Sequence, residues 1–394
     1  MKDQQFPWDW TLEGQPFTKD KGKVFSCFAC GGGSTMGYKL AGFDVIGCNE
    51  IDHRMMAAYK ANHSPRYAYN EPIQEFKLRE DLPRELYELD ILDGSPPCSS
   101  FSMSGNREKD WGEEKVFREG QAEQVLDTLF FDFIDLAEKL KPKVVIAENV
   151  RGLILGSAQR YVDKILKSFD AAGYYVGFQL LNACRMGVPQ HRERVFFYGI
   201  RKSLYTGLFA DLFDSEPVLD LGFNERQILF GEFKDEHGVD ENITPWVKER
   251  LDNMIPSDKS LSDINERLHG KVSGFNLQLV GDDELFPCLD ATAPFFRKSD
   301  SLQCTTADYS RAGTFPSDYD FCGNKPKYII GMSVPPVMIA KIATRVYDQW
   351  LVPYGDESRI EFAEEPCPKC GRFGKYDTCL SGNCMSTSME TQTH

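Results

Sequence analysis

Strand-like and helix-like runs alternate along the chain from residue 23 to about residue 200, and this alternation limits its fold more than any other feature. Short apolar runs typical of buried strands are separated by segments with the apolar spacing of helices. The predicted strands cover 23–25, 43–48, 89–93, 144–150, 174–181 and 195–200, and the predicted helices cover 36–41, 53–62, 122–139 and 158–171. The pattern predicts an α/β fold in which a mostly parallel sheet carries helices on both faces.

A cysteine follows two prolines just beyond the predicted strand at 89–93, in the turn Gly94-Ser95-Pro96-Pro97-Cys98. Each proline fixes its own φ and restricts the residue before it, so the turn is stiff. Open α/β sheets bind their ligands at the carboxyl ends of strands, and a thiolate held there is a strong nucleophile. The turn therefore predicts nucleophilic catalysis by Cys98, and the alternative is a buried structural cysteine.

A glycine-rich turn follows the first predicted strand. Residues 31–33 are all glycine, and the next predicted strand ends near Glu50. Glycines let backbone approach a ligand closely, and an acid at the end of a second strand commonly accepts hydrogen bonds from ribose hydroxyls. The two features predict a nucleoside cofactor. The lysine and the Ser/Thr of a phosphate-binding P-loop are absent from this turn, which argues against a nucleoside triphosphate.

Charged side chains mark two later strands. Glu148 lies near the end of the strand at 144–150, where a carboxyl group either caps the surface or, in a cleft, holds or protonates a ring nitrogen. Arg192 and Arg194 lead into the strand at 195–200. Residues two apart on a strand point the same way, and arginine forks suit a phosphate or an anionic intermediate. The alternative for the arginines is a solvated strand edge.

These stretches, in this order, resemble the DNA cytosine-5 methyltransferase family. The turn ending at Cys98 is similar to the nucleophile motif of that family. The other similar segments are Glu148-Asn149-Val150 (Glu-Asn-Val), Gln190, Arg192 and Arg194 (Gln-x-Arg-x-Arg) and Gly331-Met332-Ser333-Val334-Pro335-Pro336 (the last motif). The resemblance covers roughly residues 23 to 350.

The resemblance implies a Rossmann-like, S-adenosylmethionine-dependent methyltransferase fold with a second, smaller domain. The catalytic domain would cover 21–214 and be completed by 326–352, whose final helix packs beside the first strand. Residues 215–325 would form a target recognition domain that enters the major groove of double-stranded DNA.

The resemblance also implies the reaction and its residues. Cys98 would attack C6 of a cytosine flipped out of the duplex, and Glu148 would hold or protonate N3. Arg192 would support the exocyclic oxygen, with Arg194 behind it. The implied cofactor-binding residues are Phe28, Gly31, Gly33, Glu50, Ile51, Ile73, Pro97, Leu129, Ser333 and Val334, and the implied DNA-contacting residues are Ser100, Phe101, Ser102 and Gln190.

The chain departs from the family pattern near the cofactor. The family usually has Asp at the position of Ser26, Gly at that of Cys30 and Asn at that of Met332. Glu71 lies where the acidic residue beside the adenine amine is expected. The nucleophile, the glutamate and the two arginines match, so we expect an active enzyme.

A short cysteine-rich segment lies near the end of the chain. Residues 362–386 contain two pairs, Cys367 with Cys370 and Cys379 with Cys384. Short-spaced cysteine pairs are typical of four-thiolate zinc sites, so these residues predict a zinc knuckle, with free thiols in a disordered tail as the alternative. The Ser/Thr-rich residues 387–394 are expected to be disordered.

Composition bounds the class of protein and its partners. With 394 residues and 41% apolar residues the chain is long enough for one large or two smaller domains. Its apolar runs are too short to predict a membrane span, and twelve scattered cysteines suit reduced thiols in a cytoplasm. We expect a monomeric, cytoplasmic enzyme that acts in restriction-modification or phage defence, with a restriction or defence component as a partner.

The net charge of −15 is unusual for a protein that binds duplex DNA. Affinity for DNA needs local lysine and arginine contacts with phosphates. The candidates are Arg107, Lys109, Arg185, Arg192, Arg194, Arg297 and Lys298. The charge also keeps two alternatives open. One is an RNA cytosine-5 methyltransferase of the same fold, and the other is a catalytically silent DNA-binding relative.

Overall fold

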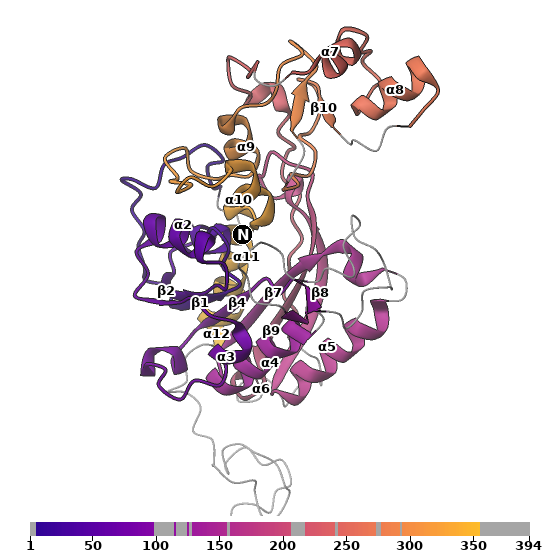
Figure 1. The fold of residues 1–394 in the computed structure, drawn as a ribbon. Coiled ribbons are helices and arrows are strands. Elements are labelled where there is room, and N and C mark those ends of the chain that lie inside the picture. The colour runs from indigo at the N-terminus through magenta and orange to yellow at the C-terminus, as the bar shows by residue number, and fades with distance from the viewer. Residues whose placement is uncertain are drawn as a thin grey trace, which may run out of the picture.

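A seven-stranded sheet forms the centre of the computed structural model, which describes residues 5–97, 114–115, 124–125, 128–155, 158–205, 217–240, 243–272, 277–291 and 294–354 (Figure 1). Its spatial order is β3 (Tyr67–Tyr69), β2 (Asp44–Asn49), β1 (Lys23–Cys27), β4 (Ile91–Gly94), β7 (Val144–Val150), β9 (Glu193–Arg201) and β8 (Tyr174–Asn182). The first five strands run parallel, which confirms the predicted, mostly parallel sheet. The pairs β7–β9 and β8–β9 are antiparallel, because residues 183–192 return the chain without a crossover helix.

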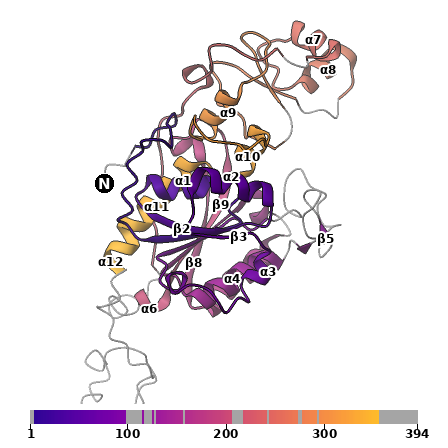
Figure 2. The same cartoon turned by 60° about the vertical axis from the view of Figure 1, so that its left-hand side comes forward.

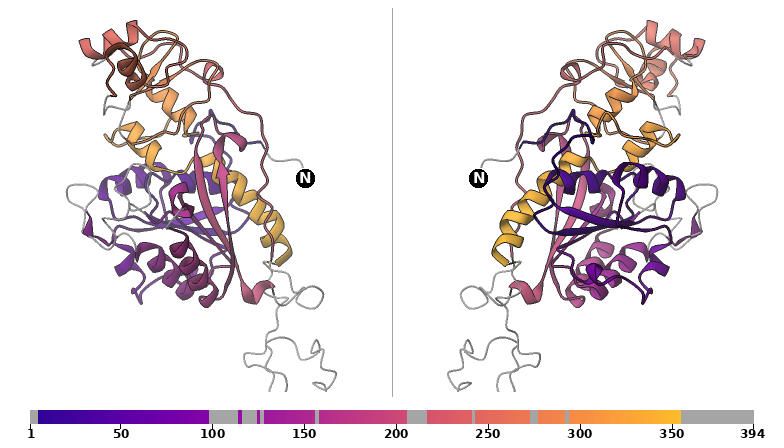
Figure 3. Two further views of the ribbon diagram at one scale, coloured as in Figure 1. Left: turned by 90° about the vertical axis from the view of Figure 1, so that its right-hand side faces the viewer. Right: turned by 90° about the vertical axis from the view of Figure 1, so that its left-hand side faces the viewer.

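Helices cover both faces of this sheet (Figures 2 and 3). One face carries α3 (Ile73–Phe76), α4 (Leu129–Leu140) and α5 (Gln159–Ala171), and the other carries α1 (Gly33–Leu40), α2 (His53–His63) and α11 (Pro336–Val346). The apolar side of α4, including Phe130, Phe133 and Leu136, is buried in the core that α3, α4 and α5 share with the sheet. The helices form core elements of a three-layer α/β unit. The helix predicted at 122–139 is shorter than expected, since α4 begins at Leu129 and Gln124–Val125 form the short strand β6.

The last described helices return to the sheet beside α1. Val337 and Ile339 of α11 share a core with Val24 of β1 and Tyr38 of α1, as the family resemblance implies. A π-helical segment, η8 (Tyr347–Leu351), and α12 (Val352–Tyr354) follow α11. Within the described residues, the stretch Pro326–Leu351 is long and apolar enough to cross a membrane, but 83% of its most apolar window is buried inside the protein. It therefore packs as a core helix.

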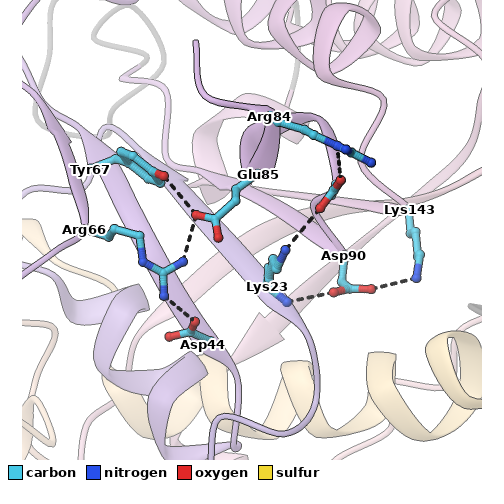
Figure 4. Close-up of polar contacts among 9 residues, drawn as sticks. Lys23, Asp44, Arg66, Tyr67, Arg84, Glu85, Asp90 and Lys143 are labelled. Atoms are coloured by element: carbon cyan, nitrogen blue, oxygen red, sulfur yellow. Dashed lines mark hydrogen bonds and ion pairs between the residues drawn. The ribbon is translucent and has the colours of Figure 1, made fainter.

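Ion pairs and hydrogen bonds tie together the amino ends of the strands, opposite the edge that carries the predicted site (Figure 4). The Asp90 carboxylate accepts the Lys23 amide at 2.7 Å and pairs with Lys143 at 2.9 Å. Arg66 pairs with Glu85 at 2.8 Å. Exposed pairs contribute little stability individually. Lys23, Asp90 and Lys143 lie at the starts of β1, β4 and β7, so their contacts fix where these strands begin relative to one another.

Residues 217–320 lead from the sheet domain, where Leu219 and Leu221 still pack in the core around α11, into a second, less regular unit beyond the carboxyl edge of the sheet (Figure 1). Its elements are η7 (Phe230–Glu232), α7 (Pro245–Asp252), α8 (Leu261–His269), β10 (Gln278–Val280), β11 (Phe295–Arg297) and α9 (Thr306–Ala312), with α10 (Pro326–Met332) leading back to the sheet. One core joins Phe230, Phe286 and Tyr309 to Met36 and Met55 on the helices α1 and α2. A smaller core unites α7, α8, β10 and β11. The break in alternation after residue 200 therefore corresponds to a structural unit seated on the sheet domain.

Short elements complete the described fold. They are η1 (Arg84–Tyr87), β5 (Glu114–Lys115), β6 (Gln124–Val125), η4 (Arg151–Ile154), η6 (Ala183–Arg185) and α6 (Lys202–Tyr205). All cysteines among the described residues are free thiols.

Candidate active site

The turn that carries the predicted nucleophile is held against β7. Asn149 donates its side-chain amide to the carbonyl of Pro96 at 3.0 Å, and both residues are buried. Pro97 is the last residue described before a gap, so Cys98, Ser100, Phe101 and Ser102 lie outside the described residues. Because Cys98 is bonded directly to Pro97, the Asn149 contact fixes the start of its turn next to Glu148. The role of Asn149 was not predicted. The sequence feature that could have indicated it is its position directly after Glu148.

Glu148 and Arg194 form a nearly buried ion pair at this edge. Arg194 Nε lies 2.8 Å from Glu148 Oε1, with side chains 15% and 11% exposed. The pair joins neighbouring antiparallel strands, since Glu148 lies on β7 and Arg194 near the start of β9. A charged partner at this distance fixes the orientation of the carboxyl group while leaving its second oxygen for another ligand.

Arg192 does not lie in front of Arg194, as the alternation of a strand suggested. Its guanidinium is buried and donates to three backbone carbonyls, those of Leu289, Gly331 and Ser333, at 3.1, 3.1 and 3.0 Å. The expectation differs from the structure because β9 begins at Glu193, so the two-residue period of a strand does not extend back to Arg192. Burial lowers the pKa of Arg192 to about 10, with the nearby Arg194 charge adding to the effect. Arg192 therefore joins backbone segments rather than facing a base.

Gln190 is likewise a packing residue in this structure and not part of a DNA-facing surface. It is 1% exposed. Its Nε2 donates to Ala312 O at 3.1 Å, and its Oε1 accepts the Leu289 amide at 3.0 Å. We call Gln190 and Arg192 the latch, because they bind the sheet domain to the unit at 217–320. The bonds join residues about a hundred or more positions apart, for which the local sequence gives no signal.

The predicted cofactor turn, residues 28–33, closes around a buried carboxylate. Glu50 accepts the Cys30 amide on Oε2 at 2.7 Å and the Asp52 amide on Oε1 at 2.8 Å. Burial raises the pKa of Glu50 to about 7, and the two amide bonds oppose this rise. Asp52 then caps α2 by accepting the amide of Arg54. Glu50 is thus held rigidly at the carboxyl end of β2, where a ribose-binding acid is expected.

The other predicted cofactor residues lie around the same edge with different exposure. Phe28, Ile51 and Pro97 are partly exposed, whereas Ile73, Leu129, Ser333 and Val334 are buried. Ile73 and Leu129 belong to the core under α4, against which Phe28 packs. A side chain on Gly33 would lie 2.8 Å from Ser333 Cβ and would overlap the Val334 carbonyl. The turn and the last motif are therefore in direct contact.

The departures from the family pattern have structural counterparts. Ser26 lies opposite Asp93 in the β1–β4 register and donates to its carboxylate at 2.7 Å, while the Tyr38 hydroxyl donates at 3.1 Å. The acid usually found on the first strand is thus replaced by one on its neighbour. Burial raises the pKa of Asp93 to about 7, although the bonds from Ser26 and Tyr38 lower it. Asp93 was not predicted to be a site residue. The sequence feature that marks it is an acidic residue inside an apolar strand.

Two positions near the turn, Cys30 and Met332, carry residues that the family does not usually have, and a third, Glu71, is the acid expected beside the adenine amine. Cys30 adopts a φ of 48°, in the left-handed region that favours the glycine usual at this position. Met332 is 47% exposed. Glu71 pairs with Arg79 at 3.3 Å.

The candidate phosphate contacts in the second unit are engaged within the protein. Arg297 is 2% exposed and pairs with Asp300 at 2.7 Å, and Lys298 pairs with Glu284 at 2.7 Å. Arg185, a further candidate that lies in η6 outside the second unit, is exposed to solvent. The expectation that Arg297 meets phosphate is therefore at odds with the structure, because its charge is neutralised in a buried pair.

Comparison with known proteins agrees with this arrangement. The family model of the C-5 cytosine-specific DNA methylases matches residues 22–348. The chain belongs to this family. The type II methyltransferase M.NgoPII of Neisseria gonorrhoeae is 35% identical over 189 residues, which cover 48% of this chain and 51% of that protein. The match thus covers about half the length of M.NgoPII and of the type II methyltransferase M.FnuDI of Fusobacterium nucleatum.

Longer but weaker likenesses extend over most of the methylase chain. M.NgoFVII of the same organism is 24% identical over 348 residues, covering 84% of this chain and 87% of that protein. A crystal structure of a protein encoded within an E. coli prophage has a TM-score of 0.56 at 18% identity, covering 83% of this chain and 99% of that one. A DNMT2 structure from Spodoptera frugiperda also has a TM-score of 0.56, at 15% identity, over 82% and 99%. These structures show a shared fold.

Proposed function

We propose that this C-5 methylase transfers a methyl group from S-adenosylmethionine to C5 of a flipped cytosine within a specific sequence of double-stranded DNA. The observation that carries the proposal is the Glu148–Arg194 pair beside the Pro-Pro-Cys turn, on the same sheet edge as Glu50. We therefore assign to this edge a nucleophile after β4, a base-holding acid on β7 and a ribose-binding acid after β2, all on parallel strands of one sheet.

The residues at this edge fit the proposed cofactor. Glu50 is buried, and amides from two sides leave acceptor capacity on both of its oxygens for ribose hydroxyls. The buried Ser333 hydroxyl lies beside the Cys30 thiol, a weak donor, and has no other partner among the described residues. S-Adenosylmethionine, when bound, supplies an electrophilic methyl group.

The protein side chains prepare the cytosine for that electrophile. Attack of Cys98 on C6 would make C5 enamine-like, so that C5 could accept the methyl group of bound S-adenosylmethionine, which would lose its S–CH3 bond and leave as S-adenosylhomocysteine. Glu148 holds N3, so that charge developing on the ring is neutralised. Loss of the C5 proton and release of the Cys98 thiolate restore the aromatic ring. Because Arg194 orients Glu148 and Arg192 is bonded to backbone, we assign Arg194 to the exocyclic oxygen and a positioning role to Arg192.

Methyl transfer to matched substrates tests this function. Purified protein, labelled S-adenosylmethionine and duplex DNA should give 5-methylcytosine at one recurring sequence, read by methylation-sensitive sequencing. A matched RNA substrate distinguishes the RNA methyltransferase alternative. Binding of DNA with no transfer to either substrate would instead favour the silent relative.

The unit at 217–320 is proposed to read the DNA sequence, as part of a recognition domain at 215–325. Base-edge contacts give roughly 1–3 kcal/mol of discrimination per good pair. Because most of the latch contacts with this region are to backbone atoms, of Leu289 and Ala312, with one side-chain contact from Arg192 to Cys288 Sγ at 3.9 Å, a relative's region that keeps a cysteine at this position can dock on the same residues. Exchanging 215–325 should move the methylated sequence and leave cofactor affinity within about twofold. A folded chimera that still methylates the original sequence would contradict the assignment.

The cysteine-rich segment is proposed to bind zinc through Cys367, Cys370, Cys379 and Cys384, which lie outside the described residues. Within the described residues, no group of three or more His, Cys, Asp or Glu side chains is arranged to hold a metal. Protein purified without chelator should contain about one zinc per chain by metal analysis. The double substitution Cys367→Ser and Cys370→Ser should remove it, whereas Cys322→Ser, at an exposed free cysteine, should not. Zinc-free wild-type protein would exclude the knuckle.

The setting of the enzyme is also a proposal. Type II methyltransferases are among the relatives of this chain, so a cytoplasmic role in restriction-modification or phage defence, with a restriction or defence component as partner, is the setting that these likenesses favour.

A further inference from the structure

The carbonyl of Gly31, in the middle of the cofactor turn, is held by side chains from outside the turn. The Tyr319 hydroxyl donates to it at 2.6 Å. His63 Nε2 lies 3.4 Å from the same oxygen. Both side chains are buried, and burial lowers the pKa of His63 to about 3, so its imidazole is neutral. Tyr319 therefore makes the shorter of the two contacts that fix this peptide group.

The glycines of the turn make room for these protein groups. A Cβ on Gly31 would lie 2.9 Å from the Tyr319 hydroxyl and would overlap Ile329, and one on Gly32 would overlap the His63 ring. Sequence analysis assigned the glycines to close approach of a ligand. In the structure they also admit Tyr319, Ile329 and His63, so the shape of the turn depends on where those side chains lie.

Tyr319 belongs to a return segment, residues 314–320, that is firmly anchored at the base of the second unit. Asn62 and Asp320 exchange two hydrogen bonds of 2.8 Å, which tie the segment to the end of α2. The Tyr319 ring packs against Phe315 and Phe321, with ring centroids 5.2 and 4.9 Å away. The hydroxyl consequently has little freedom to leave Gly31.

The N-terminal residues brace the return segment from its other side. The Trp10 indole donates to Thr314 O at 2.9 Å, and Trp10 O accepts the Ser317 amide at 2.8 Å. The Asp318 carboxylate accepts the amides of Leu12 and Glu13 at 2.7 and 2.9 Å. The segment is thus bonded to the N-terminal residues, to α2 and to the cofactor turn.

We propose that Tyr319 is a positioning residue for cofactor binding: its hydroxyl sets the Gly31 peptide and thereby the shape of the turn that receives S-adenosylmethionine. The inference rests on the proposed function, since it assumes that this turn binds that cofactor. Tyr319 supports the turn at the Gly31 carbonyl, and Glu50 supports it at the Cys30 amide. Seating of the second unit on the sheet domain is therefore a condition for tight cofactor binding.

Tyr319→Phe tests the proposal, because it removes the hydroxyl and keeps the packed ring. Calorimetric titration should show a dissociation constant for S-adenosylmethionine about fivefold above that of the wild type, the size expected for one lost buried hydrogen bond. The value of kcat at saturating cofactor should change less than about twofold, so that the effect appears in KM. Amide hydrogen exchange across residues 29–34 should become faster.

The matched control is Tyr309→Phe. Tyr309 is also buried in the second unit, and its hydroxyl accepts the Phe295 amide at 3.2 Å, away from the turn. It should leave cofactor affinity unchanged even if it lowers the melting temperature. A folded Tyr319→Phe protein with wild-type affinity and exchange would overturn the proposal, as would an equal loss of affinity in both variants. Wild-type protein that binds cofactor but methylates no cytosine would overturn the proposed function and leave this inference standing.

Discussion

Replacing Cys98 by serine should abolish methyl transfer while binding of DNA and S-adenosylmethionine persists. A serine hydroxyl is ionised far less than a thiol and is a poor nucleophile toward C6 without an adjacent base. The single-turnover rate should fall by roughly 10⁴-fold or more, as is typical when a covalent nucleophile is removed. Labelled transfer and equilibrium binding, measured on the same preparation, separate the two effects.

The covalent step can also be trapped directly. DNA carrying 5-fluorocytosine at the target cannot lose a proton from C5, so the adduct between Cys98 and C6 should persist and survive denaturing electrophoresis. Cys98→Ser should give no adduct. Cys322→Ser is the control, because Cys322 is an exposed free thiol on the segment after Tyr319 and has no assigned role in the reaction. Wild-type turnover in Cys98→Ser, or an unchanged adduct, would exclude the mechanism.

Replacing the two arginines of the Gln-x-Arg-x-Arg motif by methionine should give opposite phenotypes. Arg192→Met leaves the carbonyls of Leu289, Gly331 and Ser333 buried without their donor. Each unsatisfied group costs about 1–3 kcal/mol, so the free energy of unfolding should fall by at least about 3 kcal/mol in a urea titration. Lysine should not rescue it, since one ammonium group cannot reproduce the planar fork.

Arg194→Met should instead act on the chemical step. It removes the partner of Glu148, so the carboxyl group is no longer oriented toward the base. The single-turnover rate should fall roughly 10²- to 10³-fold, the range for losing one electrostatic contact at a reacting centre. Stability should fall less than in Arg192→Met, because Arg194→Met leaves one carboxyl group without its partner whereas Arg192→Met leaves three buried carbonyl groups without their donor. Equal effects of the two variants on both stability and rate would contradict the division of roles.

The positions of six of the strands along the chain and the sheet edge that carries the site could be predicted from the sequence, whereas the short strand β3 and the spatial order of the strands could not. Apolar runs broken by helical spacing are local patterns, and each of the six predicted strands forms in the structure. Parallel strands bring their carboxyl ends to one edge, so Glu50, Pro97 and Glu148 were placed together by their positions after or near the ends of strands. The family motifs then indicated the chemistry.

The division of labour at the site needed the tertiary structure. Arg192 and Arg194 are two residues apart, yet one binds carbonyls contributed by residues 289–333 and the other binds Glu148. Gln190 reads as a DNA contact in the motif but is closed in by Leu289 and Ala312. The Asp93 carboxylate opposite Ser26 and the Tyr319 hydroxyl on Gly31 depend likewise on strand register and on chain return. Sequence by itself determined the elements and the residue types at the edge, because these follow from local periodicity and turn chemistry. Which side chain faces the substrate and which holds the fold was decided by contacts between distant segments, which leave no local pattern to read.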